Sequence, residues 1–195
     1  MSTDRTKNVA SLDGKWDFLY VTDVDEAKIL VAARLLQRSR DWTAIPVPSN
    51  WQLSTKFDRP IYTNVKYPFP AAPPHVPAKN PTGIYRKKFV LKEDWAKTAD
   101  TDTYTVLFHG VSSAFYVHLN GAFVGYSQDS CLPAEFDITD ALRRSERGTH
   151  VLEVICIRWS DGSFLEDQDH WWLSGIHRSV EIIRKPGEAE VTDFR

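Results

Sequence analysis

Apolar and polar residues alternate along much of the chain, and this pattern predicts β-strands. The apolar positions carry many β-branched and aromatic residues, which favour pleated strands, and polar or glycine-containing turns separate them. Asn120-Gly121 lies between two such stretches, and this dipeptide is the strongest short-range indication of a β-hairpin. About eight strands are predicted, at 12–21, 85–91, 103–110, 114–120, 122–127, 135–139, 150–159 and 177–185.

Two stretches depart from the strand pattern. Residues 25–42 have the apolar spacing of a helix of about three turns, and residues 132–145 can hold one helical turn after Thr139. Strands that follow one another with short turns favour an antiparallel sandwich over a βαβ fold. We therefore expect an all-β sandwich with one or two short helices.

A long proline-rich segment divides the predicted strands. Nine of the eleven prolines lie between Pro46 and Pro81, so this segment cannot form a regular helix or a central strand. It is also rich in aromatic residues: Trp51, Phe57, Tyr62, Tyr67 and Phe69. We expect an ordered arm packed over the body of the domain, and long loops of this kind are often functional.

Composition argues against nucleic acid or a membrane as partner and indicates a reducing compartment. The 195 residues favour one domain, and the net charge of −2 without a block of like charge predicts neither nucleic acid nor a membrane surface as partner. The most apolar run, 27–36, contains Lys28 and Arg34 and is too short to span a bilayer. Cys131 and Cys156 lack metal or redox spacing, which favours reduced thiols and a cytoplasmic protein.

The stretch FLEDQDHWWLSGIHR, 164–178, gathers the residues that are best suited to chemistry. Glu166 and Asp169 could form a glycosidase pair, which needs carboxyl groups about 5–5.5 Å apart for retention or about 6.5–9.5 Å apart for inversion. The same acids could accept hydrogen bonds from sugar hydroxyls, while Trp171 and Trp172 offer flat apolar faces. A purely structural role, with Trp159, Trp171 and Trp172 in the core and the acids capping turns, stays open.

Metal binding is a further possibility for this stretch. Asp161, Asp167 and Asp169 supply the hard oxygen ligands that sodium, calcium or magnesium prefer, but their spacing matches no calcium loop. His170 and His177 have no partners at the spacing of a zinc site. The residues alone therefore predict no particular metal.

Asn64 forms a second candidate, between tyrosines and prolines in IYTNVKYP. Its amide can donate and accept at once, which suits a sugar hydroxyl, although an asparagine here could equally bond its own turn. The sequence contains no glycine-rich phosphate loop and no G-x-S-x-G motif. From residues alone, the prediction is a β-sandwich with a carbohydrate-binding surface.

A family resemblance makes this prediction more specific. The motifs VPSNWQ, PIYTNVKYP, NPTGIYR, GVSSAFYVHLNG, VGYSQDSCLPAEFDIT and RWSDGSFLEDQDHWWLSGIHR follow one another in this order. Together they resemble the N-terminal domain of β-galactosidases of glycoside hydrolase family 2, the lacZ-type enzymes and their plant relatives. The resemblance extends from about residue 11 to the C-terminus, and only 22–40 fits it poorly.

The resemblance implies a fold and a division of labour. It implies a galactose-binding-domain-like jelly roll over 11–187, preceded by an N-terminal tail at 1–10 and followed at 188–195 by the start of a linker to a further domain. In the family, a TIM barrel carries both catalytic glutamates and the catalytic magnesium. Because this chain stops before that barrel, no acid of 164–178 is expected to be the nucleophile or the general acid.

The resemblance also assigns four residues. Asn64 matches the asparagine that this domain extends toward the galactosyl site. Asp169 matches the aspartate that contacts galactose hydroxyls and helps to ligate sodium, whose other protein ligands belong to the barrel. Gln128 and Asp161 match two ligands of a peripheral magnesium site, which is incomplete without a segment upstream of the jelly roll.

Three roles follow as expectations. The first is the sugar-binding domain of a β-galactosidase, which acts on terminal β-galactosides and has the remaining domains of the enzyme as partners. The second is a stand-alone module that binds galactose or β-galactosides. The third is a structural subunit that kept the fold and lost the sugar.

Overall fold

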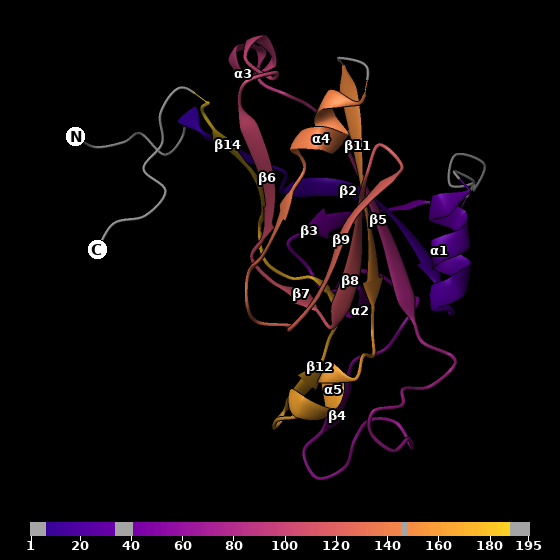
Figure 1. Cartoon of the computed structure of the whole chain (residues 1–195). Coiled ribbons are helices and arrows are strands. Elements are labelled where there is room, and N and C mark those ends of the chain that lie inside the picture. Colours follow the sequence, from indigo (N-terminus) through magenta and orange to yellow (C-terminus); the bar gives the residue numbers. More distant parts are fainter. Residues whose placement is uncertain (1–6, 34–40, 146–147, 188–195) are drawn as a thin grey trace, which may run out of the picture.

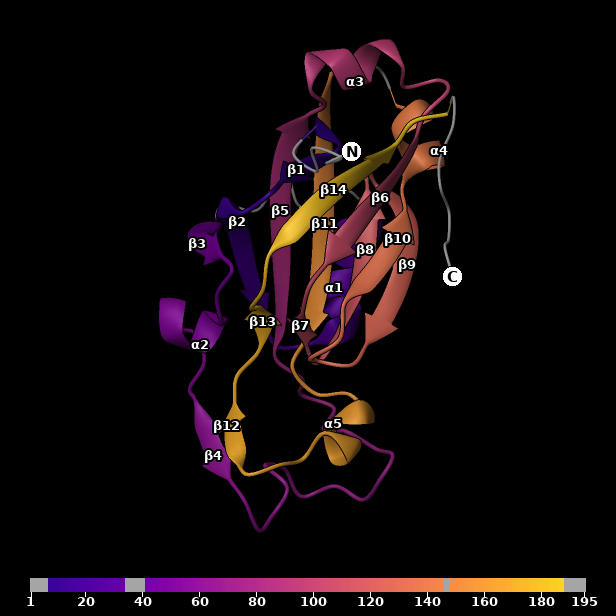
Figure 2. The same cartoon turned by 90° about the vertical axis from the view of Figure 1, so that its left-hand side faces the viewer.

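A computed structural model of the chain describes residues 7–33, 41–145 and 148–187, and two antiparallel sheets form its body (Figures 1 and 2). The larger sheet has the strand order β3 (Thr43–Val47), β2 (Gly14–Val21), β5 (Thr82–Val90), β11 (Thr149–Ile157), β8 (Ala114–Leu119) and β9 (Ala122–Gln128). The smaller has the order β1 (Val9–Ser11), β14 (Val180–Lys185), β6 (Thr103–Phe108) and β10 (Ala134–Asp137). The predicted all-β antiparallel sandwich is confirmed.

The core between the two sheets is rich in aromatic side chains. Its largest members are Trp16, Trp51, Trp95, Tyr85, Tyr104, Phe18, Phe108 and Phe115. Strand β11 is buried on both faces, because Val154 and Cys156 point into this core while Ile155 and Ile157 belong to a second cluster under a helix. This double burial explains why HVLEVICIRW is a nearly continuous apolar run.

The helix over this second cluster is α1 (Val24–Ala32). Asp23 caps its N-terminus by accepting hydrogen bonds from the backbone N–H groups of Asp25 and Glu26. Ala27 and Val31 pack on the outer face of the larger sheet (Figure 1). The predicted helix at 25–42 is confirmed as far as Ala32; its positions 34–40 lie outside the described residues, and Asp41 and Trp42 are not helical.

The predicted hairpin joins β8 to β9. Leu119 pairs with Ala122, so Asn120 and Gly121 are the two loop residues. Both have positive φ, 54° and 79°, as the favoured two-residue hairpin turn requires. The side-chain oxygen of Asn120 also accepts a 2.9 Å hydrogen bond from the N–H of Val151, which fixes the hairpin to β11.

The proline-rich arm is ordered, as predicted, but it contains short regular elements. Pro46 lies in β3, which is an edge strand and so tolerates the missing donor. A single helical turn, α2 (Trp51–Ser54), follows, and β4 (Ile61–Thr63) pairs with β12 (His170–Trp172). The arm ends at Asn80, whose amide bonds both the N–H and the C=O of Trp159.

The number of helices and the start of the first strand differ from prediction. One or two short helices were expected, but the described residues also include α3 (Glu93–Lys97), α4 (Thr139–Arg143) and α5 (Gly162–Leu165), five helices with α1 and α2. Of these, the turn after Thr139 was predicted; single turns at the other places are too short to show apolar periodicity. Strand β1 begins at Val9, two residues before the expected start of the sandwich.

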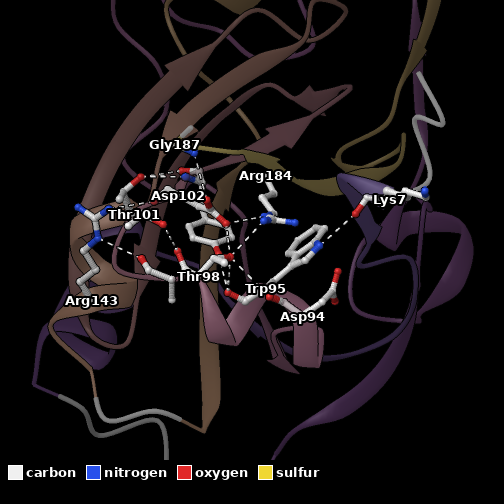
Figure 3. A network of polar contacts seen from close by, with 12 residues as sticks. Lys7, Asp94, Trp95, Thr98, Thr101, Asp102, Arg143, Arg184 and Gly187 are labelled. Carbon is white, nitrogen blue, oxygen red and sulfur yellow. Dashed lines mark hydrogen bonds and ion pairs between the residues drawn. The ribbon is translucent and has the colours of Figure 1, made fainter. Parts of the chain in front are cut away.

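Two further pairs complete the fold. Strands β7 (Val111–Ser112) and β13 (Gly175–Ile176) pair with each other beside the main sheets. At the end of the sandwich opposite the arm, Asp102 accepts hydrogen bonds from Thr98, Arg184 and Gly187, which ties the end of β14 to the residues after α3 (Figure 3). No helix that the structure describes is long and apolar enough to cross a membrane.

Candidate sugar-binding edge

Strand pairing brings the two predicted sugar contacts together. In the β4–β12 ribbon, His170 lies opposite Thr63 and Trp172 lies opposite Ile61. Asn64 follows Thr63 and Asp169 precedes His170, just outside the paired residues, and the side chain of Tyr62 hydrogen-bonds with both of them. A hydrogen bond of 2.8 Å from the Trp172 indole N–H to the Thr63 hydroxyl holds the two strands in this register.

Tyr62 links these two residues. Its hydroxyl donates a short hydrogen bond to a carboxylate oxygen of Asp169, and its ring lies 5.6 Å from that of Trp171. The hydrogen bond to the Asp169 carboxylate raises the pKa of Tyr62, because the bond is lost when the phenol ionises, and the nearby Asn64 amide opposes this shift. The ribbon therefore presents an amide, a phenol and a carboxylate beside one exposed indole.

Sequence reasoning had singled out Asn64, Asp169 and Trp171 but treated Tyr62 only as one of several aromatic residues in the arm. The available signal was its place two residues before Asn64, which in a strand puts both side chains on one face. This signal depends on knowing that IYT is a strand. The proline content of the segment argued against that assignment.

A small buried aromatic cluster packs against the β4–β12 ribbon and includes its residue Trp172. Four buried rings form it: Phe69, Trp159, Phe164 and Trp172. Trp159 is in edge contact with both Phe69 and Trp172, at centroid distances of 5.1 and 5.5 Å. The structural interpretation of the tryptophans is thus correct for Trp159 and Trp172, whereas Trp171 is 60% exposed.

A buried ion pair anchors the arm at Asp58. Asp58 receives hydrogen bonds from the guanidinium of Arg158, the indole N–H of Trp51 and the amide of Gln52. Burial lowers the pKa of Arg158, and the charge of Asp58 opposes that shift. Because breaking one side of such a buried pair leaves an uncompensated charge, the pair constrains where the arm leaves the sandwich.

The three acids of 164–178 have separate roles. Glu166 accepts hydrogen bonds from the N–H and the hydroxyl of Ser130, at 2.8 and 2.7 Å, and so holds the loop after β9. Asp169 contacts Tyr62 instead, and one carboxylate oxygen of Asp167 is buried without a hydrogen-bond partner in the described chain. Glu166 and Asp169 are therefore engaged with different elements, which argues against a shared catalytic site.

The predicted metal ligands lie in two places. Asp161 accepts a hydrogen bond from the N–H of Gly162, and Gln128 accepts one of 2.7 Å from the hydroxyl of Tyr126. Burial raises the pKa of Tyr126, and the charges of Tyr116 and Asp161 add to the shift, so Asp161 lies near the phenol whose hydroxyl bonds Gln128. Across 7–33, 41–145 and 148–187, no three His, Cys, Asp or Glu residues gather into a group that could hold a metal ion.

A family comparison covers nearly the whole domain. Residues 9–186 match the model described as the sugar binding domain of glycosyl hydrolases family 2. The β-galactosidase of Vibrio cholerae is 49% identical over 92% of this chain, and that of Pseudoalteromonas haloplanktis is 49% identical over 94%. The chain spans only 17% of the length of each of these two proteins.

Solved structures show the same fold at lower identity. A β-glucuronidase from an uncultured Clostridium superposes with a TM-score of 0.62 at 21% identity, over 91% of this chain and 29% of that protein. The β-glucuronidase of Bifidobacterium dentium, complexed with coumarin-3-O-glucuronide, superposes with a TM-score of 0.61 at 17% identity, over 95% of this chain and 31% of that one. At these identities the likeness establishes the fold alone.

Proposed function

Because the chain belongs to the sugar binding domains of glycosyl hydrolase family 2, we propose that it is the galactose-contacting domain of a β-galactosidase. In this role Asn64 and Asp169 contact hydroxyl groups of a terminal β-galactoside. The acid/base and the nucleophile come from a barrel that is not among the described residues. The observation that carries the proposal is that Tyr62, in the paired strands β4 and β12, contacts both side chains, which supports a single sugar-facing edge containing both residues.

The chemistry of this edge is suited to positioning rather than to bond cleavage. The Asp169 carboxylate can accept charge-assisted hydrogen bonds from hydroxyls, and the amide of Asn64 can both donate and accept. Tyr62 occupies one Asp169 oxygen and leaves the other for a ligand. Fixing the galactosyl group in this way lowers the entropic part of the barrier in a neighbouring catalytic site.

The same end of the domain supports docking of the rest of the enzyme. Several large apolar side chains are exposed there, among them Val65 at 87%, Leu165 at 88% and Trp171 at 60%. They lie in or next to β4, β12 and α5, which are all at one end of the sandwich (Figure 2). Large exposed apolar side chains at one end of a domain are typical of a surface that another domain covers.

We also propose that Asp169 is one ligand of a sodium ion whose remaining ligands belong to the barrel. Its exposed carboxylate is a hard oxygen donor of the required kind. Asp161 and Gln128 similarly offer two oxygen donors to a peripheral magnesium ion, with further ligands from upstream of this domain. The free thiols of Cys131 and Cys156 support a cytoplasmic setting.

A chimera tests the proposed role directly. The corresponding domain of the Vibrio cholerae β-galactosidase is replaced by this chain, and kcat/KM is measured for a nitrophenyl β-galactoside. Loss of a charged hydrogen bond, worth about 1.5–3 kcal/mol, predicts that Asp169→Ala lowers kcat/KM about 10- to 150-fold. The control is Asp140→Ala, because Asp140 pairs only with Arg144 on the surface of the described chain.

The outcomes separate the three roles. Loss of hydrolysis in the Asp169→Ala chimera, with the Asp140→Ala chimera unchanged, supports the proposal. Galactose binding by the isolated chain as tight as by the chimera would instead support a stand-alone module. If the Asp169→Ala chimera were as active as the parent, Asp169 would not contact the sugar, and the role of a structural subunit would be favoured. Replacing sodium by potassium should lower kcat/KM in the parent and have little further effect in Asp169→Ala.

A further inference from the structure

The side chain of Tyr62 lies on the exposed face of the β4–β12 ribbon. Its chain neighbours Ile61 and Thr63 face the other way, toward the buried cluster that contains Trp172, because side chains alternate along a strand. The ring of Tyr62 lies beside that of Trp171, its cross-strand partner, at a centroid distance of 5.6 Å. The ribbon therefore fixes where the phenol hydroxyl is presented.

This hydroxyl connects Asn64 to Asp169. It donates its proton to a carboxylate oxygen of Asp169. A phenol has only one proton, so in its second contact, with the side chain of Asn64, the phenol oxygen is the acceptor. The contact with Asn64 also opposes the rise in the pKa of Tyr62, as a donor to the phenol oxygen does.

The order of donors and acceptors fixes the orientation of both side chains. Asn64 can supply a hydrogen bond to the phenol only from its NH₂ group, which leaves its carbonyl oxygen as the acceptor available to a ligand. On Asp169, the phenol occupies one oxygen and leaves the second. The edge therefore offers one acceptor oxygen from each residue, and these oxygens suit hydroxyl groups that donate.

Tyr62 is the residue that restrains Asn64 and Asp169. Both side chains are exposed to solvent, where side chains exchange rapidly among staggered rotamers. Within the part of the chain that the structure describes, neither makes a hydrogen bond or ion pair with any other side chain. Without the phenol hydroxyl, each would be in any one of its three χ1 wells only about a third of the time.

We propose that Tyr62 is a positioning residue of the sugar-binding edge, whose hydroxyl holds Asn64 and Asp169 so that both present an acceptor oxygen to the galactosyl group. Tyr62 acts through these two residues and not on the reacting atoms. The inference rests on the proposed function, because the sugar is the ligand for which the two side chains are oriented.

The restraint itself can be measured in the 195-residue chain without a ligand. Tyr62→Phe removes the hydroxyl and keeps the ring beside Trp171. The matched control is Tyr67→Phe, because Tyr67 belongs to the same arm, is 43% exposed against 48% for Tyr62, and packs by its ring on Phe164. Three-bond NMR couplings report the χ1 populations of Asn64 and Asp169. We expect one dominant rotamer in the parent and in Tyr67→Phe, and averaging over several rotamers in Tyr62→Phe.

The consequence for sugar binding is measured in the chimera with the Vibrio cholerae enzyme. Releasing one side chain lowers the binding-competent fraction to about one third, and releasing both lowers it to about one ninth. The Ki of phenyl 1-thio-β-D-galactoside should therefore rise about 3- to 9-fold in Tyr62→Phe. The kcat for a nitrophenyl β-galactoside should stay within about twofold, because a bound sugar selects the competent rotamers. A merely structural role would lower the amount of folded enzyme, and so lower kcat and leave Ki unchanged.

Two results would overturn the proposal. One is a single rotamer for Asn64 and Asp169 in Tyr62→Phe, and the other is an unchanged Ki in Tyr62→Phe when Asp169→Ala raises Ki. Failure of the proposed function gives a different pattern, in which Tyr62→Phe releases the rotamers but neither variant changes Ki. That pattern would support the hydrogen-bonded restraint and refute its use by a sugar.

Discussion

Asp102 is the residue whose replacement should destabilise the domain most clearly through a polar mechanism. Its carboxylate is almost fully buried and accepts hydrogen bonds from Thr98 and from Arg184 Nε on one oxygen, and from the N–H of Gly187 on the other (Figure 3). The isosteric change Asp102→Asn replaces one acceptor oxygen by an NH₂ donor. In either orientation of the amide, its NH₂ group then faces an N–H donor, that of Arg184 or that of Gly187.

The expected loss follows from this geometry. Arg184, with its side chain only 16% exposed, would remain without its charged partner. Removing one partner of a buried ion pair costs about 3–5 kcal/mol. For a domain of this length that loss corresponds to about 6–20 °C in Tm, and it is a large fraction of a total stability of about 5–15 kcal/mol.

Urea unfolding monitored by tryptophan fluorescence measures this difference. The matched control is Asp140→Asn, because Asp140 and Arg144 form a surface pair with both side chains 78% exposed, where the change should stay within about 0.5 kcal/mol. A loss of less than about 1 kcal/mol in Asp102→Asn would refute the reasoning. It would mean that Arg184 finds other partners at little cost.

The pH dependence of stability gives an independent check. Burial alone would raise the pKa of Asp102, but the hydrogen bonds from Thr98, Arg184 and Gly187 outweigh burial and lower it. A carboxyl with a lowered folded-state pKa stabilises the fold above its unfolded pKa of about 3.9, and this contribution is lost as the pH falls further. The gap in stability between the parent and Asp102→Asn should therefore be full at neutral pH and narrow below about pH 4.

Three other changes have expected outcomes. Gly83→Ala should cost about 1–3 kcal/mol in urea unfolding, because the new Cβ would lie 2.6 Å from Phe18 Cε2 in the packed core; an unchanged midpoint would contradict this. Phe69→Ala should cost about 3–5 kcal/mol and alter the near-ultraviolet circular dichroism, since the ring is 8% exposed among other aromatic rings; an unaltered spectrum would count against that packing. Trp171→Ala should change stability by less than about 0.5 kcal/mol but weaken galactose binding; a larger loss of stability would identify the ring as structural.

The strands that were predicted are those whose signal is local. The β8–β9 hairpin follows from Asn120-Gly121, because only residues that tolerate positive φ suit both turn positions. Strand β11 follows from its long apolar run. The strands that were missed, such as β4 and β7, have three and two residues, and pairing partners more than sixty residues away define them as strands.

In the candidate site, too, some features could be predicted from nearby sequence, whereas others depend on contacts between distant segments. Its residue types could be read from the sequence, because carboxylates, an amide and an indole are groups that suit a sugar. Their assignment to particular roles could not. Glu166 and Asp169 are three residues apart and chemically alike, yet one holds the loop after β9 and the other joins Tyr62.

The proline-rich arm explains why a site can be built from such distant segments. Its prolines restrict the unfolded chain, and this lowers the entropy lost when the arm becomes ordered. The Asp58–Arg158 pair and the Asn80 amide anchor two positions of the arm on consecutive residues, Arg158 and Trp159. Between these two anchors β4 pairs with β12, and Tyr62 of β4 contacts both Asn64 and Asp169. The position of the sugar-binding edge is thus a consequence of how the arm is anchored.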